Sequence, residues 1–206
     1  DGPVSAYVTV FQDNDIFRMY YRGLHGEKSS QVACYAESQD GISWKKPKLG
    51  LFESGGSKEN NIVWTGPGTH NFTPFKDTRP GVSQNERYKA LGSGRINGKR
   101  GLHAFVSADA IHWKLLVDNL VITKGAFDSQ NLAFWDAALG KYRAYWRTFT
   151  EGVTEVKVWK PAGFRAIRTG TSRDFLHWAG DADLTYVDSP AEHLYTNQVK
   201  PYYRAP

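Results

Sequence analysis

The sequence predicts an all-β fold, a β-propeller built from four-stranded antiparallel blades. Three observations predict it: a turn pattern that recurs at a near-constant interval, strand-like runs in the same order before each turn, and weak helix signals. No 11-residue window shows a sustained apolar pattern at positions i, i+3, i+4 and i+7, as an amphipathic helix requires. Repeated short antiparallel meanders of this kind are typical of propeller blades.

The recurring turn has the pattern Ser-x-Asp-x-x-x-Trp. It occurs at Ser38–Trp44, Ser107–Trp113 and Ser172–Trp178, with the three Asp residues 69 and 65 positions apart. Ser and Asp side chains accept backbone N–H bonds in tight turns between strands. We expect the Trp that follows to pack between neighbouring blades, so the pattern predicts structure and not catalysis.

Strand-like runs rich in β-branched and aromatic residues precede each turn. The first run of each copy covers residues 6–12, 71–76 and 131–135. The second covers 16–22, 87–91 and 141–147, and the third covers 31–37, 102–106 and 164–169. Turn residues separate the runs, and a fourth strand after the Ser-x-Asp turn is less clearly marked. Each unit therefore predicts one blade.

The units divide the chain into blades of residues 1–64, 65–124 and 125–190, with the start of a fourth over 191–206. Three blades and one strand leave unpaired sheet edges and cannot close a ring. We therefore expect one partial propeller domain that belongs to a longer chain.

Composition excludes several classes of function. The net charge is +5, but basic and acidic residues alternate without a block of like charges, which argues against nucleic-acid binding. No apolar run is long enough to span a membrane, and the single cysteine excludes an internal disulfide. The six histidines lack metal-ligand spacing, and Gly92-Ser93-Gly94 is not followed by a helix. We expect no metal and no cofactor.

Residues at the start of each blade's first strand converge on the central channel of a propeller. The carboxylates in these segments are Asp128, Glu192 and Asp1, which we predict to be catalytic. Carboxylates from different blades that meet in one cleft suit acid–base cleavage of a glycosidic bond. The residues that we expect to bind the sugar are His70, Asn71, Gln130, Asn131, Tyr195, Asn197 and, from the loop between the first two blades, Glu59.

The chain resembles the five-bladed glycoside hydrolases of families 32, 43, 68, 117 and 130. The resemblance is carried by Ser38–Trp44 with Lys46-Pro47 after it, and by residues 59–64, 127–131 and 192–197, which resemble bacterial glycosyl hydrolase-like proteins. It implies a five-bladed ring with carboxylates at the inner-strand starts of the first three blades. The second unit departs from it, with His70-Asn71 where families 32 and 43 have an Asp, so only Asp128, Glu192 and Asp1 are carried over.

The sequence thus predicts a glycoside hydrolase that acts on a poly- or oligosaccharide outside the cytoplasm. One alternative is a non-catalytic carbohydrate-binding propeller, which His70-Asn71 would support. A sialidase-like enzyme is another, but Arg79, Arg143 and Arg147 form no recognisable carboxylate clamp. Asp77 and Asp136 lie near hairpin turns, and turn chemistry explains them.

Overall fold

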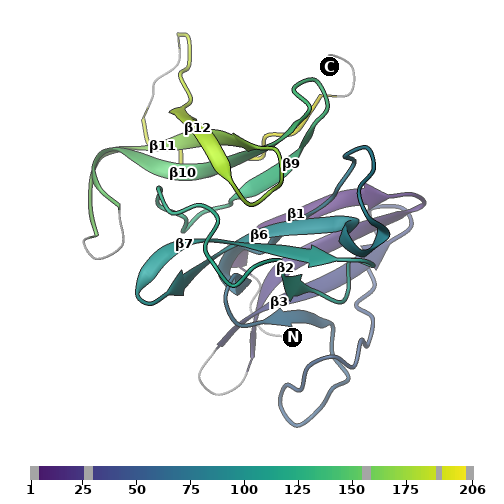
Figure 1. Cartoon of the computed structure of the whole chain (residues 1–206). Coiled ribbons are helices and arrows are strands. Elements are labelled where there is room, and N and C mark those ends of the chain that lie inside the picture. Colours follow the sequence, from purple (N-terminus) through teal and green to yellow (C-terminus); the bar gives the residue numbers. More distant parts are fainter. Residues whose placement is uncertain (1–4, 26–29, 155–158, 189–191, 203–206) are drawn as a thin grey trace.

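The computed structural model describes residues 5–25, 30–154, 159–188 and 192–202. These residues form three four-stranded antiparallel sheets. The helices among them are two single 3-10 turns, η1 (Thr69–Asn71) and η2 (Gln84–Glu86). The predicted all-β fold of four-stranded propeller blades is confirmed, and Figure 1 shows the sheets following one another along the chain.

Each sheet is a meander in which consecutive strands pair. The first sheet, blade 1, contains β1 (Ser5–Asp13), β2 (Ile16–His25), β3 (Ser30–Ser38) and β4 (Ile62–Thr65). Blade 2 contains β5 (Thr73–Lys76), β6 (Tyr88–Ile96), β7 (Lys99–Ser107) and β8 (Lys114–Leu115). Blade 3 contains β9 (Leu132–Asp136), β10 (Lys141–Val153), β11 (Lys160–Ser172) and β12 (Trp178–Asp183).

Several strands are longer than the sequence predicts, most clearly β6. We expected this strand to end at Leu91, but it continues to Ile96. Glycines weaken the strand signal here, yet Gly92 is needed because a Cβ at this position would lie 2.7 Å from the Cα of Gly68. The glycine that this close approach requires weakens the strand signal in the sequence, but the pairing with β7 shows that the strand continues to Ile96.

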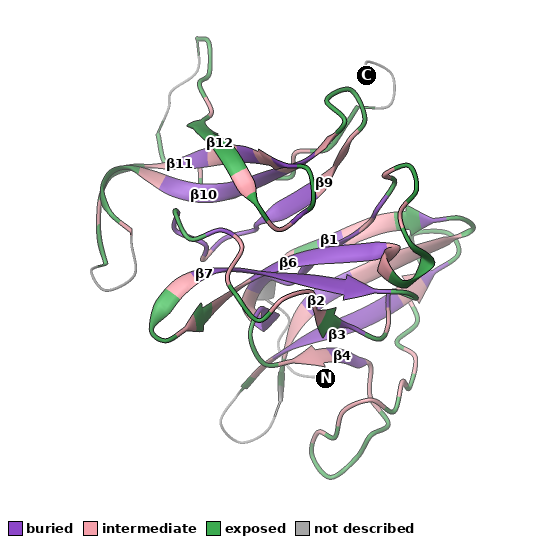
Figure 2. Ribbon diagram, in the orientation of Figure 1, coloured by how far each residue is buried: buried purple, intermediate pink, exposed green. Residues whose placement is uncertain are grey.

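Aromatic side chains pack the blades against each other. Between blades 1 and 2, the Trp113 ring lies edge-on to Tyr20 and Phe72, with centroid distances of 6.1 and 5.1 Å. Between blades 2 and 3, the ring centroids of Phe75 and Phe175 lie 5.7 Å apart. Figure 2 shows that the strand centres are buried and the turns exposed. Trp113 thus packs between neighbouring blades, as predicted, whereas Trp44 packs against a cluster of residues of its own blade, Cys34 among them.

The Ser-x-Asp turns have the structural role that the sequence predicts. In the second turn, Ser107 Oγ accepts a bond from Ala110 N at 2.9 Å, and Asp109 Oδ1 accepts from Ile111 N and His112 N at 2.9 and 2.8 Å. Although burial opposes the shift, the bonds from His112 lower the pKa of Asp109 to about 2. The first and third turns repeat these backbone bonds with Asp40 and Asp174.

Asp77 and Asp136 make the turn contacts that the sequence predicts, with Leu139 N donating to Asp136 Oδ1 at 3.2 Å, and they also bind partners on other strands. Asp77 is buried, and it accepts bonds from Lys89 Nζ at 2.8 Å and from the Tyr142 hydroxyl of the next blade at 2.5 Å. It also accepts from Arg79 N at 2.9 Å, the turn contact that the sequence suggests. Asp136 pairs with Arg143 Nε at 3.1 Å. Turn chemistry alone misses these partners because they lie on neighbouring strands and blades.

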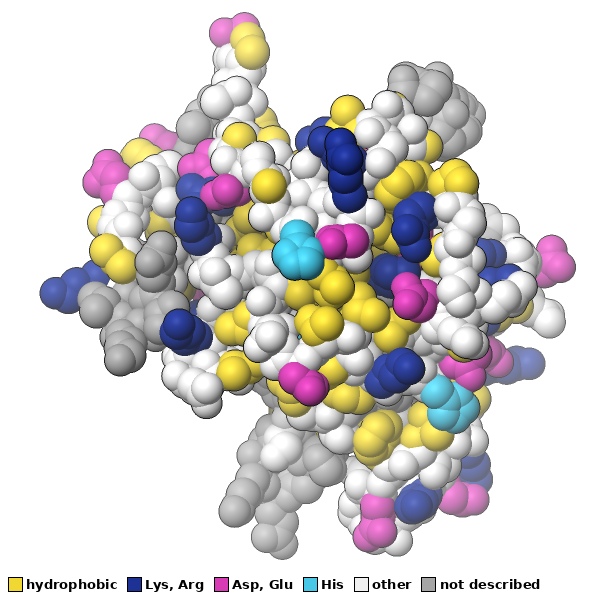
Figure 3. All heavy atoms as spheres, viewed as in Figure 1, with side chains coloured by type: hydrophobic (Ala, Val, Ile, Leu, Met, Phe, Trp, Pro, Cys, Tyr) yellow, Lys and Arg dark blue, Asp and Glu magenta, His cyan; other side chains and the backbone are white. Residues whose placement is uncertain are grey.

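Charged side chains of both signs lie on the face of the molecule seen in Figure 3. Figure 3 shows Lys and Arg interspersed with Asp and Glu around an apolar centre on one face of the molecule. Among the residues that the structure describes, no helix is long and apolar enough to cross a membrane.

Candidate functional site

The first strands of the three blades converge on one axis. Together with residues 198–201, strands β1, β5 and β9 line a cavity of about 360 Å³. The Lys200 ammonium donates to Val10 O at 3.0 Å, which joins the C-terminal segment to blade 1. Most of this cavity wall is apolar, with Phe11, Phe75 and Phe134 among its residues. This cavity therefore offers an apolar surface for packing and few polar groups that could take part in a reaction.

Polar residues gather at the mouth of this channel, where the first strands begin. The Tyr7 hydroxyl of blade 1 donates to the carbonyl oxygen of Asp128 in blade 3 at 3.0 Å, and it lies 3.1 Å from the Tyr195 hydroxyl. Ser129 Oγ donates to Tyr195 O at 2.7 Å. Burial and then the bond to Tyr195 raise the pKa of Tyr7 to about 12, which keeps its hydroxyl protonated at neutral pH.

Asp128 lies at this mouth and forms an ion pair with Arg147 of β10. The Asp128 side chain is 36% exposed and that of Arg147 only 2%, so the carboxylate reaches solvent while the guanidinium lies behind it. Asp128 also lines a cavity of about 270 Å³. The other residues around this cavity are His70, Ser93, Gly94, Arg95, Arg100 and Phe127. We refer to it as the mouth cavity.

His70 lies in the wall of the mouth cavity and is held by blade 1. Arg22 Nη1 donates to His70 Nδ1 at 2.7 Å, and the Tyr7 ring lies 5.7 Å from the imidazole. Burial and then the positive charge of Arg22 lower the pKa of His70, so the imidazole is neutral near pH 7. His70 Nδ1 also lies 3.0 Å from Gln31 Oε1, so Arg22 and Gln31 both hold the imidazole from blade 1.

The four predicted amide residues lie behind the mouth and are buried. Asn71 Nδ2 donates to Phe127 O at 2.7 Å and to Ser129 O, and Asn71 Oδ1 accepts from Ser93 N at 2.8 Å. Asn71 thereby fixes the backbone on both sides of Asp128.

The remaining amides hold neighbouring segments in the same way. Asn131 Nδ2 donates to Ser129 O at 2.9 Å, and Gln130 Nε2 donates to Thr9 Oγ1 at 3.2 Å. Asn197 Nδ2 donates to Gln130 O at 3.1 Å. The Oδ1 atoms of Asn131 and Asn197 are buried without a partner among the described residues. The structure gives these amides a positioning role, and direct contact with a sugar stays a prediction.

The structure does not bring every predicted residue to the mouth cavity. Glu59 is exposed, pairs with Lys48 at 3.0 Å and lines a separate cavity beside β2 and β3. Glu192 is exposed and lies three positions before Tyr195, which contacts Tyr7. Asp1 lies outside the described residues.

Sequence reasoning predicted Tyr195 but assigned no part in the site to the arginines around Asp128. The Arg147 guanidinium carbon lies 4.9 Å from the centroid of the Tyr195 ring, and that of Arg165 lies 5.5 Å from the same ring. Arg22 and Arg147 end the two similar runs 16–22 and 141–147, so aligning the repeats would have paired them. Arg79 and Arg143 do not join this cluster, because Arg79 lies over Tyr142 and Arg143 pairs with Asp136.

No metal site emerges from the described part of the chain. Within it, no group of three or more His, Cys, Asp and Glu side chains is placed to hold an ion. The chemistry available at the mouth is that of a carboxylate, a neutral imidazole, phenol hydroxyls and guanidinium groups.

Comparison with known proteins supports the fold. No protein-family model matches the sequence, and no curated protein matches it. Among solved structures, a fructofuranosidase from Schwanniomyces occidentalis complexed with fructosylnystose is 12% identical with a TM-score of 0.57. A thermostable family-43 glycoside hydrolase is 15% identical with a TM-score of 0.54. An N-acetylgalactosamine deacetylase from F. plautii, in complex with blood group B trisaccharide, is 13% identical with a TM-score of 0.53.

The alignments cover most of this chain but only part of each neighbour. They include 89%, 89% and 83% of this chain for the fructofuranosidase, the family-43 hydrolase and the deacetylase. They include 34%, 54% and 50% of those proteins, in the same order. The resemblance to glycoside hydrolase propellers is thus confirmed at the level of the fold.

Proposed function

We propose that this chain carries part of the active site of a glycoside hydrolase, with Asp128 as the carboxylate that activates water or attacks the sugar. The observation that carries the proposal is the place of Asp128 at the mouth of the channel, where three blades and residues 192–202 meet. Two of the structural neighbours are glycoside hydrolases. Because one fold supports several chemistries, the assignment rests on the site.

The contacts of Asp128 favour the role of base or nucleophile over the role of general acid. The buried Arg147 guanidinium forms an ion pair with Asp128. An ionised carboxylate serves as base or nucleophile, whereas the leaving oxygen needs a protonated acid. We assign that acid to Glu192, the other described carboxylate that the sequence predicts, which lies three positions before Tyr195. His70, which lies in the wall of the mouth cavity, would bind a sugar hydroxyl.

The reaction then follows the two-carboxylate scheme. Glu192 gives its proton to the glycosidic oxygen as the bond from the anomeric carbon to that oxygen breaks. In one route, water that gives its proton to Asp128 forms the new bond to the anomeric carbon. In the other, Asp128 forms that bond itself, and water that gives its proton to Glu192 then displaces Asp128 from the sugar. An extracytoplasmic location, where a polysaccharide is encountered, belongs to the same proposal.

Turnover of aryl glycosides and polysaccharides tests the proposal. General acid–base groups contribute roughly 10²–10⁴-fold to rate, so Asp128→Asn and Glu192→Gln should each lower kcat by at least about 100-fold while sugar binding persists. Asp118→Asn, an exposed acid outside the cavities described above, is the matched control. Turnover that survives in the Asp128→Asn protein would disprove the role of Asp128.

One observation favours a second candidate, a non-catalytic carbohydrate-binding propeller. Asp128 is the single carboxylate among the residues that line the mouth cavity, and Arg147 already neutralises it. Sugar binding without turnover across a broad panel of glycosides would establish this alternative.

A further inference from the structure

The mouth cavity carries an excess of positive charge. Its lining contains two guanidinium groups, Arg95 and Arg100, and one carboxylate, Asp128. The carboxylate is already paired with the buried Arg147, and His70 is held neutral beside Arg22. The charges of Arg95 and Arg100 are therefore not balanced by an acidic side chain within this lining.

The two arginines face each other across a rigid hairpin. Arg95 of β6 and Arg100 of β7 are directly opposite in register, so their side chains lie on the same face of the sheet. Asn97 and Gly98 link the strands with φ angles of 49° and 78°, which are characteristic of a tight two-residue turn. Arg95 Nη1 also donates to Gly98 O at 3.3 Å. The hairpin thus presents both guanidiniums from one short, well-defined element.

Like charges directly opposite each other destabilise a sheet. Burial, and then the charge of Arg95, lower the pKa of Arg100, and Asp128 counteracts this only in part. The Arg100 guanidinium carbon lies 4.8 Å from the centroid of the Trp159 ring, which positions the side chain without neutralising it. An anion bound between the two arginines would offset this repulsion.

We propose that Arg95 and Arg100 bind a negatively charged group, a carboxylate or a sulfate, carried by the sugar that occupies the mouth cavity. The ligand class is therefore an acidic glycan. Guanidinium groups suit this task because their planar N–H donors match the paired oxygens of such groups. This inference deepens the proposed function, since it takes the ligand to be a saccharide.

The site is a compact cavity of about 270 Å³ beside the channel mouth, and not a basic stripe along the surface. A charged substituent on one sugar fits such a cavity, whereas a nucleic-acid backbone needs an extended basic track.

Binding measured by calorimetry on the 206-residue chain tests the proposal with matched ligand pairs. The pairs are oligogalacturonates with their methyl esters, oligoglucuronates with their methyl esters, and sulfated galactan oligosaccharides with their desulfated forms. We expect at least one charged member to bind about tenfold or more tightly than its neutral counterpart. Whether the uronates or the sulfated sugars show this preference identifies the charged group.

Variants of the two hairpin arginines test whether these residues cause the tighter binding of charged sugars. Arg100→Gln and Arg95→Gln should remove it, and Arg100→Lys should keep only part of it because the fork geometry is lost. Arg173→Gln, an exposed arginine in a Ser-x-Asp turn, is the matched control. Thermal unfolding of each variant checks that the fold is kept.

The proposal is overturned if neutral members bind as tightly as charged ones in every pair, if no member binds, or if the preference survives in Arg100→Gln and Arg95→Gln. It is also overturned if inorganic phosphate or sulfate binds while the acidic sugars do not. Because this test measures binding, charged-sugar selectivity without turnover would refute the hydrolase and not the subsite. Hydrolysis of neutral sugars, without any preference for charged ones, would refute the subsite and not the hydrolase.

Discussion

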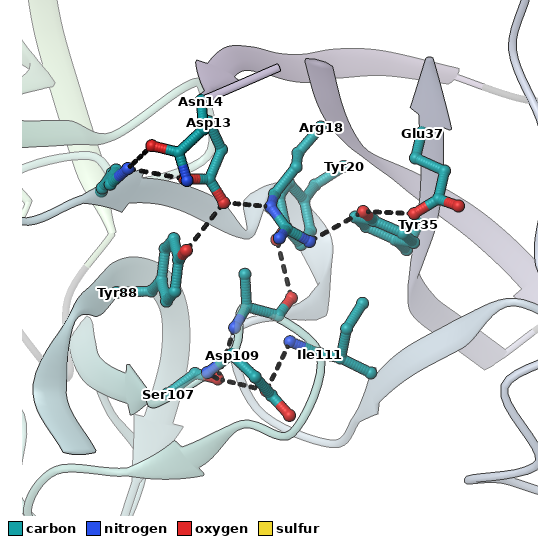
Figure 4. Close-up of polar contacts among 12 residues, drawn as sticks. Asp13, Asn14, Arg18, Tyr20, Tyr35, Glu37, Tyr88, Ser107, Asp109 and Ile111 are labelled. Atoms are coloured by element: carbon teal, nitrogen blue, oxygen red, sulfur yellow. Dashed lines mark hydrogen bonds and ion pairs between the residues drawn. The ribbon is translucent and has the colours of Figure 1, made fainter. Parts of the chain in front are cut away.

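The Tyr88 hydroxyl of blade 2 donates a hydrogen bond of 2.7 Å to Asp13 Oδ2, the carboxylate at the end of the first strand of blade 1 (Figure 4). Arg18 Nε and Lys76 Nζ bind the same carboxylate at 2.6 and 2.7 Å. The arrangement recurs one blade later, where Tyr142 and Lys89 bind Asp77. A repeated Tyr–Asp–cation contact thus joins neighbouring blades.

Removing the tyrosine hydroxyl should weaken this contact between blades. We expect Tyr88→Phe and Tyr142→Phe each to lower the free energy of unfolding by about 1–2 kcal/mol, because a buried carboxylate loses one donor and keeps its cation. Urea denaturation measures the change. Tyr186→Phe, which alters an exposed hydroxyl, should stay within about 0.5 kcal/mol of the wild type. Equal effects in all three variants would contradict a specific role for the contact.

Asp13 should make stability depend on pH in the acid range. Although burial opposes the shift, the bonds from Lys76, Tyr88 and Arg18 lower the pKa of Asp13 to about 2, from an ordinary value of 3.8. A carboxyl with a lower pKa in the folded state stabilises the fold above its unfolded pKa, and this stability is lost as pH falls through the folded pKa. The free energy of unfolding should therefore decline between about pH 4 and pH 2.

Chemical denaturation across this range, for the wild type and Asp13→Asn, measures the contribution. The variant should be less stable at neutral pH and should show a shallower decline in acid. Asp118→Asn, which changes an exposed acid, should keep the wild-type slope. If Asp13→Asn declines as steeply as the wild type, the acid sensitivity has another source.

Asn71 should matter for both stability and the site. Asn71→Ala leaves Ser93 N without its side-chain partner and leaves Phe127 O and Ser129 O with Asn131 Nδ2 alone, which should cost about 1–3 kcal/mol of unfolding free energy. Because Asp128 lies between two of these anchored residues, sugar binding should weaken as well. Thermal unfolding and calorimetry measure the two effects.

Asn71→Asp should be at least as harmful as Asn71→Ala, since it places a carboxylate against two carbonyl oxygens. Asn119→Ala changes an exposed amide and is the control for stability. Wild-type sugar binding in a folded Asn71→Ala protein would show that this amide does not position Asp128.

Cys34 should be unreactive in the native protein. Burial raises the pKa of its thiol to about 11, with Lys46 opposing the shift, and the residue is 7% exposed. The thiolate is the reactive form. Iodoacetamide at about pH 8 should therefore leave the native chain unmodified and label one site after unfolding in urea, as mass spectrometry would show. Rapid labelling of the native chain would contradict this packing.

Local patterns made the blades and their turns predictable. In the Ser107–Trp113 turn, each bond that defines the turn joins residues two or three positions apart, so the sequence specifies it without knowledge of the fold. Asp77 shows the limit of such reasoning. Its partners Lys89 and Tyr142 lie 12 and 65 positions away, and a local motif does not reveal them.

The site was predictable only in part. The sequence indicated Asp128 and His70 because they begin first strands, and the structure places both in the wall of the mouth cavity. It did not indicate Arg147 and Arg22, although they occupy matching positions in two repeats. Arg147 meets Asp128 of its own blade, whereas Arg22 meets His70 of the next blade. Equivalent residues thus acquire different partners.

The sequence by itself determined the alternation of strands and turns, because strand propensity and Ser-x-Asp capping act over a few residues. Only the tertiary structure decided which side chains meet at the channel mouth, since the segments that meet there lie up to 188 positions apart, as Tyr7 and Tyr195 do. The packing of whole blades sets such contacts. For the same reason the charge of the cavity, with Arg95 and Arg100 beside a paired Asp128, became visible only in the folded chain.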